Sequence, residues 1–334
     1  MVKFTLLEKI VSPALIIGGF NFVKKVLQIF ILVSGAIFIL ASISGCTNTT
    51  DHTRSELNVG LMASIDAFPI VIAYRQGYFE DEGLNVNLIP FSSAGTRDAS
   101  ILAGELDATT ADLVAVGLFI EAGLPIRATG LTGGRFTLVA NEGFYSINDL
   151  KGEAIVISEN TAIDFVLDHM VTSAGFELDH IKRSIVPSIP DRMELLRAGQ
   201  ATAAVLPEPW ASIAINDGLY GITNTIDLDF IPFIIAFTDS VLENQPEDVR
   251  AFYRAYNRAI DFLNNNPLEA YFYMMVEEIN FSEAVADFLI LPDFTHNTLP
   301  EMYVLEAAID WLITRKLVSP NMNPTDLINR VAFE

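Results

Sequence analysis

The sequence LNVGLMASIDAFPIVIAYRQGYFEDEGLNVNLIP, residues 57–90, decides the fold class. It predicts a strand at 57–61, a partly buried helix at 68–77 that ends at a glycine, and a second strand at 86–90. Short strands that alternate with helices are typical of α/β proteins. This stretch therefore predicts an α/β fold.

The same alternation continues along the chain, and a second series begins near residue 148. The helical end of the chain is interrupted at Pro267. Further strands are predicted at 107–110, 126–131, 136–140, 154–158, 185–186, 203–206 and 231–237; further helices are predicted at 95–104, 113–122, 161–174, 191–198, 249–263, 268–278 and 301–316.

The two series resemble each other. LAGELDA (102–108) and LRAGQATA (196–203) each combine a helix end, a glycine turn and the start of a strand. A chain of 334 residues is too long for one ordinary core and suits about two lobes of typical domain size. Two similar α/β lobes explain the likeness better than a solenoid, whose repeats are much shorter.

The charge is strongly asymmetric. The net charge is −22, but residues 1–45 carry four lysines and one glutamate, so the rest of the chain carries −25. A body this acidic repels phosphate backbones, which excludes nucleic-acid binding as a main activity. Because the chain has 23 Phe and 9 Tyr, it has ample material for a core, which excludes intrinsic disorder.

Residues 1–45 have the organisation of a secretory signal, because Lys24 and Lys25 precede an apolar run at 26–40 and a series of small or apolar residues. The ending ISGC resembles a bacterial lipobox, in which Cys46 is diacylated and becomes the new N-terminus. A flexible tether is expected at 46–56. The alternative is a transmembrane anchor in which the cysteine has no role. Since the signal is unusually long, translation is expected to start near Val23.

The sequence lacks the residue patterns that most catalytic mechanisms require. A single Cys cannot form an internal disulfide, and no Cys/His group has zinc-ligand spacing. The four histidines are scattered, and no HExxH, GxSxG or phosphate-binding loop is present. The sequence therefore predicts a protein that is not an enzyme and holds no cofactor or metal.

GYFEDEGLNV (77–86) resembles the GYF-x-x-EGL-x-V signature of extracytoplasmic solute-binding proteins of ABC importers, in the group that binds nitrate, sulfonates, taurine or thiamine precursors. AGELD (103–107), DLKG (149–152) and EPWA (208–211) match the same group in order. The resemblance implies a type II periplasmic-binding-protein fold, with two α/β lobes joined by two crossing strands near 136–140 and 231–237. Lobe I is then expected at 57–140 and 232–334, and lobe II at 141–231.

The resemblance also implies partners and a location. The expected partners are a small-molecule solute and an ABC permease with its ATPase, and the chain is expected to be a monomer held outside the cell membrane by its lipid. Some enzymes of thiamine and menaquinone biosynthesis share this fold, so an enzyme of cofactor biosynthesis is an alternative, although a cytosolic catalyst would carry no lipobox. A lipid-anchored adhesin or sensor partner is a third possibility.

Ligand residues are expected where strands end and helices begin, because helix N-termini offer free N–H groups there. Each of these residues has a purely structural alternative, mainly helix capping. In lobe I the candidates are Ser64, Asp66, Phe68, Ser93, Gly95, Thr96, Thr110 and Asp112; in lobe II they are Glu159, Asn160, Thr161 and Glu208.

The candidate carboxylates outnumber the candidate cations, which are Arg97 and Arg135. Glu159 stands where relatives often have a glycine-serine pair, and its charge disfavours oxyanions. Glu208 lies between two prolines, and a carboxylate on a stiff turn suits an amine or a pyrimidine N–H. The sequence therefore favours a neutral or cationic heteroaromatic ligand such as a thiamine precursor, and a sulfonate or nitrate is the alternative.

Overall fold

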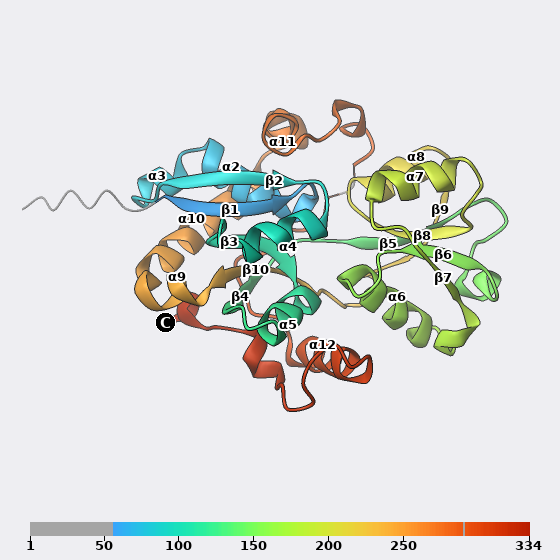
Figure 1. Ribbon diagram of the computed structural model, residues 1–334. Helices are drawn as coiled ribbons and strands as arrows, with labels where there is room; N and C mark the ends of the chain where they lie inside the picture. Colours follow the sequence, from blue (N-terminus) through green and yellow to red (C-terminus); the bar gives the residue numbers. More distant parts are fainter. Residues whose placement is uncertain (1–55, 290) are drawn as a thin grey trace, which may run out of the picture. The chain divides into compact units, whose positions relative to one another are not determined.

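The computed structural model describes residues 56–289 and 291–334 (Figure 1). The predicted signal at 1–45, the lipidated Cys46 and nearly all of the tether lie outside these residues. Within the described ranges, no helix is both long enough and apolar enough to cross a bilayer.

The first sheet and the helices around it form lobe I. Its strand order is β2-β1-β3-β10-β4, and only β10 runs antiparallel to its neighbours. The strands are β1 (Leu57–Met62), β2 (Val86–Phe91), β3 (Ala108–Asp112), β4 (Ile126–Leu131) and β10 (Phe233–Thr238); the helices are α2 (Phe68–Arg75), α3 (Tyr78–Asp81), α4 (Ala94–Leu102), α5 (Leu113–Glu121), α9 (Asp239–Asn244), α10 (Pro246–Asn265), α11 (Phe272–Ile279) and α12 (Met302–Thr314).

Lobe II repeats the same plan around the second sheet. The order is β7-β6-β8-β5-β9, and β5 is antiparallel to both of its neighbours. The strands are β5 (Phe136–Ala140), β6 (Ala154–Ile157), β7 (Lys182–Ile185), β8 (Ala203–Pro207) and β9 (Tyr220–Asn224); the helices are α6 (Ala162–Ser173), α7 (Ile189–Arg197) and α8 (Trp210–Asn216). Two α/β lobes, as predicted, are confirmed.

One boundary needs correction. Strand β5 was expected within lobe I, but it pairs with β8 and β9 in the second sheet (Figure 1). The chain therefore passes between the lobes at 132–135 and again at 225–232. The five residues of β5 are all buried, and an apolar run of this kind fits the centre of either sheet, so its composition cannot choose between them.

The predicted likeness of the two series has a structural basis. Helices α4 and α7 each end just before a glycine with positive φ, Gly104 at 72° and Gly199 at 64°, and a strand of the same lobe follows. Glycine adopts this conformation without the steric cost that a Cβ atom brings. The same local device therefore closes a helix-to-strand turn once in each lobe.

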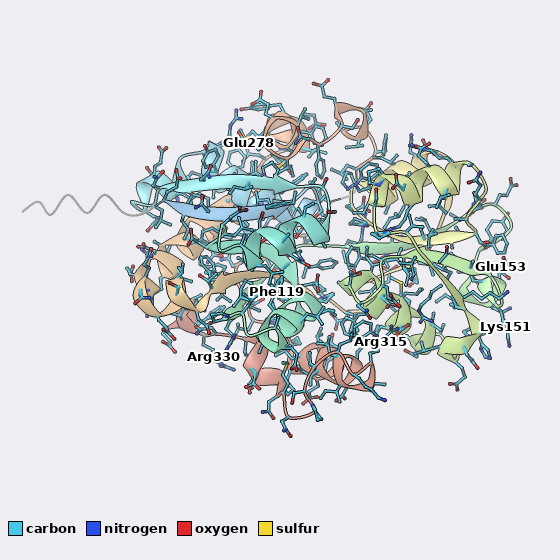
Figure 2. All side chains as sticks on the ribbon, viewed as in Figure 1. Phe119, Lys151, Glu153, Glu278, Arg315 and Arg330 are labelled. Carbon is cyan, nitrogen blue, oxygen red and sulfur yellow. The ribbon has the colours of Figure 1, made fainter. Side chains whose placement is uncertain are left out.

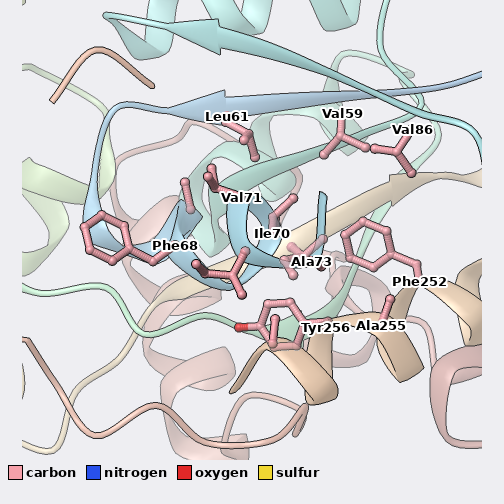
Figure 3. Close-up of a cluster of buried hydrophobic side chains, with 14 of the residues drawn as sticks. Val59, Leu61, Phe68, Ile70, Val71, Ala73, Val86, Phe252, Ala255 and Tyr256 are labelled. Carbon is pink, nitrogen blue, oxygen red and sulfur yellow. The ribbon is translucent and has the colours of Figure 1, made fainter. Parts of the chain in front are cut away.

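The core of lobe I lies between its sheet and helices α2 and α10. Val59 and Leu61 of β1 face Ile70 and Val71 of α2, and Phe252 packs beside them (Figure 3). All five side chains are completely buried. This packing fixes the position of the turn between β1 and α2, which carries part of the candidate site.

A buried ion-pair cluster joins α6 of lobe II to α12. Asp164 accepts hydrogen bonds from Arg183 Nε at 3.1 Å and from Arg315 Nη1 at 2.9 Å. Asp168 accepts from Arg315 Nη2 and from Trp311 Nε1, both at 2.8 Å, and also pairs with Arg183. Figure 2 shows Arg315 at this junction. The cluster connects helices that are far apart in the sequence.

Candidate functional site

A cavity of about 860 Å³ lies where strand ends of both lobes face each other. The turns after β1, β2 and β3 form its lobe I wall, and the turns after β6, β7 and β8 form its lobe II wall. This is the expected ligand position in open α/β sheets. Most of the predicted ligand residues line it, namely Ser64, Asp66, Ser93, Gly95, Asp112, Glu159, Asn160, Thr161 and Glu208.

The other three predicted residues do not line the cavity. Phe68 is fully buried, and its ring lies 5.2 Å from that of Phe281 in the lobe I core. Thr110 is also fully buried, and its Oγ1 accepts a hydrogen bond from Met62 N at 3.0 Å. Thr96 Oγ1 donates to the carbonyl of Ser93 at 2.9 Å. These three side chains hold the walls in place.

Asp66 is the most unusual polar group in the cavity wall. Its side chain lies in the short turn after β1 and is only 4% exposed, and Oδ1 has no hydrogen-bond partner among the described residues. Burial raises the pKa of this carboxyl to about 7; nearby Arg97 lowers that pKa and Asp112 raises it. The expected alternative, capping of α2, is not observed, since Ala67 is the N-cap residue. A ligand N–H could satisfy the open oxygen.

The remaining lobe I candidates combine capping with a place in the wall. Asp112 Oδ1 caps α5 by accepting from Ala115 N at 2.8 Å, and burial raises the pKa of Asp112. Ser93 caps α4 by accepting from Thr96 N at 3.3 Å. A Cβ built on Gly95 meets no protein atom within 4 Å, so the space beside its backbone is open to a ligand. The helix-capping roles are therefore observed, and they leave these residues able to contact a ligand as well.

The turn before α6 is the lobe II counterpart. Asn160 adopts a left-handed conformation with φ 57°, and its N–H donates to Asp164 at 3.2 Å. Thr161 caps α6 by accepting from Ile163 N at 3.3 Å. Glu159 is exposed, so its charge faces water and is screened. The repulsion of oxyanions that Glu159 was expected to cause is correspondingly weak.

Glu208 is buried at the wall, but its charge is already balanced. Oε1 accepts from Arg135 Nε at 3.1 Å and also pairs with Nη2, while Oε2 accepts from Ser212 Oγ at 2.6 Å and Ser212 N at 3.1 Å. The sequence could not predict this ion pair, because Arg135 lies in the segment that crosses between the lobes and Glu208 follows the distant strand β8. Glu208 is therefore less suited than Asp66 to pair with a ligand cation.

Arg192 also lines the cavity, and the sequence analysis missed it. Its guanidinium donates to the carbonyls of Val186 at 2.7 Å, Pro187 at 2.8 Å and Val205 at 3.3 Å, and to Ser158 Oγ at 3.2 Å. Burial lowers the pKa of Arg192 to about 10. An arginine on a short amphipathic helix is usually solvent-exposed, so no sequence pattern indicated that Arg192 would be buried.

Aromatic and proline side chains complete the lining. Phe136 of β5 in lobe II and Phe233 of β10 in lobe I lie 4.6 Å apart between ring centroids. Phe91 and Trp210 line the cavity from lobes I and II. Ring faces of this kind stack on planar ligands. Phe68 was expected to stack on the ligand, but these four aromatic side chains line the cavity and Phe68 does not.

Within 56–289 and 291–334, no three His, Cys, Asp or Glu side chains are grouped so as to hold a metal ion. His169 stacks on Phe230 with ring centroids 3.6 Å apart, and burial lowers its pKa. This is the structural role that its place on α6 predicts.

Residues 64–270 match the profile of the family described as NMT1/THI5 like. A protein of Brucella abortus named as a binding protein is 27% identical over 247 residues, which cover 71% of this chain and 74% of that protein. A protein of Brachyspira hyodysenteriae named as an ABC transporter periplasmic binding protein is 19% identical over 261 residues, which cover 73% of this chain and 75% of that protein.

Solved structures share the fold at low sequence identity. The alkanesulfonate-binding protein SsuA of Xanthomonas axonopodis, bound to MOPS, is 16% identical with a TM-score of 0.69, and the match covers 82% of this chain and 98% of that chain. The nitrate-binding protein NrtA of Synechocystis is 12% identical with a TM-score of 0.66, covering 83% and 86%. The desulfurization enzyme DSZB is 15% identical with a TM-score of 0.61, covering 83% and 97%. The predicted periplasmic-binding-protein fold is confirmed.

Proposed function

Because the chain belongs to the NMT1/THI5-like family, we propose that it is the solute-binding component of an ABC importer and holds a small solute in the cavity between its lobes. The observation that carries this proposal is the buried Asp66 Oδ1, which has no hydrogen-bond partner among the described residues and belongs to a side chain of the cavity lining. An unsatisfied buried acceptor costs free energy that a bound ligand would recover. The name of the Brachyspira relative points the same way.

Binding between two lobes supplies a signal for the permease. A solute that contacts both walls interacts more strongly with the conformation in which the lobes approach each other. The ligand thereby shifts the population toward that closed conformation, and the permease can distinguish loaded from empty protein by it. The walls that would meet are the turns after β1–β3 and after β6–β8.

The ligand class follows from the wall chemistry. Asp66 accepts an N–H or a protonated nitrogen, and the aromatic side chains Phe91, Phe136, Phe233 and Trp210 stack on a planar ring. A nitrogen heteroaromatic of pyrimidine type fits both features. Because Glu208 is paired with Arg135, this proposal rests on Asp66 and no longer on an excess of free carboxylates.

Binding without conversion is the expected activity. Among the described residues that line the cavity there is no cysteine, so this lining offers no thiol nucleophile. Cytosine or thiamine incubated with purified full-length protein should be recovered unchanged by mass spectrometry, with at most one molecule bound per chain. Recovery of a converted product that accumulates over many turnovers would contradict the proposal and favour an enzyme of this fold.

The lipid anchor is a separate part of the proposal. Cys46→Ser should abolish incorporation of an alkynyl palmitate analogue and release the protein from the membrane fraction, because two acyl chains are needed for stable attachment. Thr50→Ala, in the expected tether, should leave both unchanged. A Cys46→Ser protein that still carries the label would exclude this cysteine as the attachment site.

A further inference from the structure

Helix α12 is attached to lobe I by its packing. Its buried face lies on α5, and the two helices are so close that a Cβ built on Gly117 would lie 2.5 Å from Leu312 Cδ1. Further along the chain, Asn329 donates its N–H to the carbonyl of Ala128 on β4 at 2.8 Å. Helix α12 and the chain that follows it are therefore fixed to the first sheet and its helices.

The polar side chains at the end of α12 reach lobe II instead. Arg315 donates to Asp164 Oδ2 at 2.9 Å and to Asp168 Oδ2 at 2.8 Å, and both carboxylates belong to α6. Trp311 Nε1 donates to the same Asp168 oxygen at 2.8 Å. Both carboxylates are almost completely buried. Separating α12 from α6 would take Arg315 away from them, and breaking up a buried ion-pair cluster is costly.

The second crossing segment, 225–232, is attached on the same side of the molecule. Tyr303, in the first turn of α12, donates its hydroxyl hydrogen to the carbonyl of Asp229. Phe230 is fully buried, and its ring lies 5.1 Å from that of Phe165 on α6. This crossing is therefore held by both α12 and α6.

The first crossing segment, 132–135, has a more flexible composition. It contains Gly133 and Gly134, whereas the second crossing has no glycine and ends in Pro232. Glycine has the widest backbone freedom, while proline fixes φ. The lack of a Cβ also admits the Phe233 ring beside Gly134, so this glycine has a packing role as well. Torsion changes that rotate one lobe against the other are therefore easier in the first crossing.

We infer that α12 is a strap, which holds lobe II at α6 and at the second crossing, so that the lobes rotate about the α12–α6 contact and the two glycines of the first crossing take up the bending. The strap goes beyond the proposed function, because it concerns where the lobes move and not what they bind. The first turns of α4 and α7 line the cavity from lobes I and II. These two turns should move apart while α12 and α6 stay together.

Distances between pairs of spin labels in full-length, ligand-free protein test the strap without a solute. The labels are placed at exposed positions of Cys46→Ser protein, so that only introduced thiols react: Ala99→Cys on α4 with Ala198→Cys just after α7 spans the cavity, and Ser173→Cys on α6 with Glu306→Cys on α12 spans the strap. Electron–electron resonance should give a distance distribution across the strap that is about twofold narrower than the one across the cavity. Equal widths would overturn the inference, because a strap on one side requires unequal motion.

Substitution of Arg315 then tests what holds the strap. Arg315→Gln should broaden the distribution across the strap to the width seen across the cavity, and Arg315→Lys, which keeps the charge, should broaden it less. Arg197→Gln is the control, since it breaks an exposed ion pair within lobe II and should leave the distribution unchanged.

A folded Arg315→Gln protein with the narrow wild-type distribution would contradict the strap. If this variant does not fold, the two widths in protein that keeps Arg315 decide the question, since that comparison needs no change in the ion-pair cluster. Failure of the strap would leave the proposed function standing, because solute binding is tested separately at Asp66.

Discussion

Asp66→Asn is expected to stabilise the ligand-free protein at about pH 8 and, at the same time, to remove most of its affinity for heteroaromatic amines. The stability gain follows from linkage. The pKa of Asp66 is about 7 in the folded protein and 3.8 ordinarily. Because the folded state holds the proton more tightly, the stability that this proton provides is complete below about pH 4 and is lost as the pH rises through about 7. One pKa unit is worth about 1.4 kcal/mol, so the upper bound is about 4 kcal/mol.

The groups that influence the pKa of Asp66 come from several helices and strands. Desolvation dominates; Arg97 on α4 favours the charged form of Asp66, while Asp112 at the end of β3 opposes it. Burial raises the pKa of Tyr256 on α10, and the nearby Asp66 charge raises it further. Urea denaturation between about pH 5 and pH 8 should therefore show a falling stability in wild type, and a smaller fall in Asp66→Asn. The exposed Asp310→Asn is the control and should follow wild type.

Asp66→Asn should weaken ligand binding even though it stabilises the ligand-free protein. A charged hydrogen bond is worth about 1.5–3 kcal/mol, so Asp66→Asn should weaken binding of a heteroaromatic amine by at least about tenfold. A ligand that binds the ionised carboxylate should also bind wild type more weakly below about pH 7, and titration calorimetry would detect this. A variant that is destabilised at pH 8, or that binds as wild type does, would show that Asp66 is merely structural.

Asp164→Ala is expected to cause the largest loss of stability, about 3 kcal/mol or more. The Asp164 side chain is fully buried, and it binds Arg183, Arg315 and the N–H of Asn160. Its removal leaves two arginines to share Asp168, and one partner of a buried cluster is costly to lose. Urea unfolding with unchanged m-value should report the loss as a lower midpoint.

The same substitution, Asp164→Ala, should also disturb the wall of the cavity. Asn160 has a left-handed backbone and lines the lobe II wall, and its N–H loses its acceptor in Asp164→Ala. Weaker binding of a heteroaromatic amine should therefore accompany the lower stability. Asp179→Ala is the matched control, because its side chain is 86% exposed and should change stability by less than about 0.5 kcal/mol. An Asp164→Ala protein as stable as this control would contradict the account of the cluster.

Local sequence patterns predicted the architecture well, because each element carries its own signal. These signals extend over only a few residues each: the alternation of strands and helices, the glycines at 104 and 199 that end helices, and the proline after α10. Strand β5 was assigned to the wrong lobe because its buried apolar residues fit either sheet. Strand β9, at the edge of the second sheet, is partly exposed and was missed.

The sequence could predict a residue of the site only where its position at the end of a strand was enough to place it in the cavity wall. The rule that ligands bind at strand ends correctly brought Ser64, Asp66 and Asn160 to the cavity. It failed for Phe68, since the turn after β1 directs that ring into the core. The pairing of Glu208 with Arg135 and the burial of Arg192 depend on contacts between distant segments, which one sequence does not encode in a readable pattern.

Thermal unfolding of the full-length protein with a ligand panel tests whether the cavity binds a nitrogen heteroaromatic through Asp66. The panel contains cytosine, adenine, thiamine and pyridoxamine phosphate, beside nitrate and ethanesulfonate. Ligand at about one hundred times its Kd adds about 2.7 kcal/mol of stability, which is readily seen as a higher Tm. We expect a higher Tm with at least one nitrogen heteroaromatic in wild type, and little or none of that rise in Asp66→Asn. A rise with only nitrate or ethanesulfonate, equal in both proteins, would contradict it.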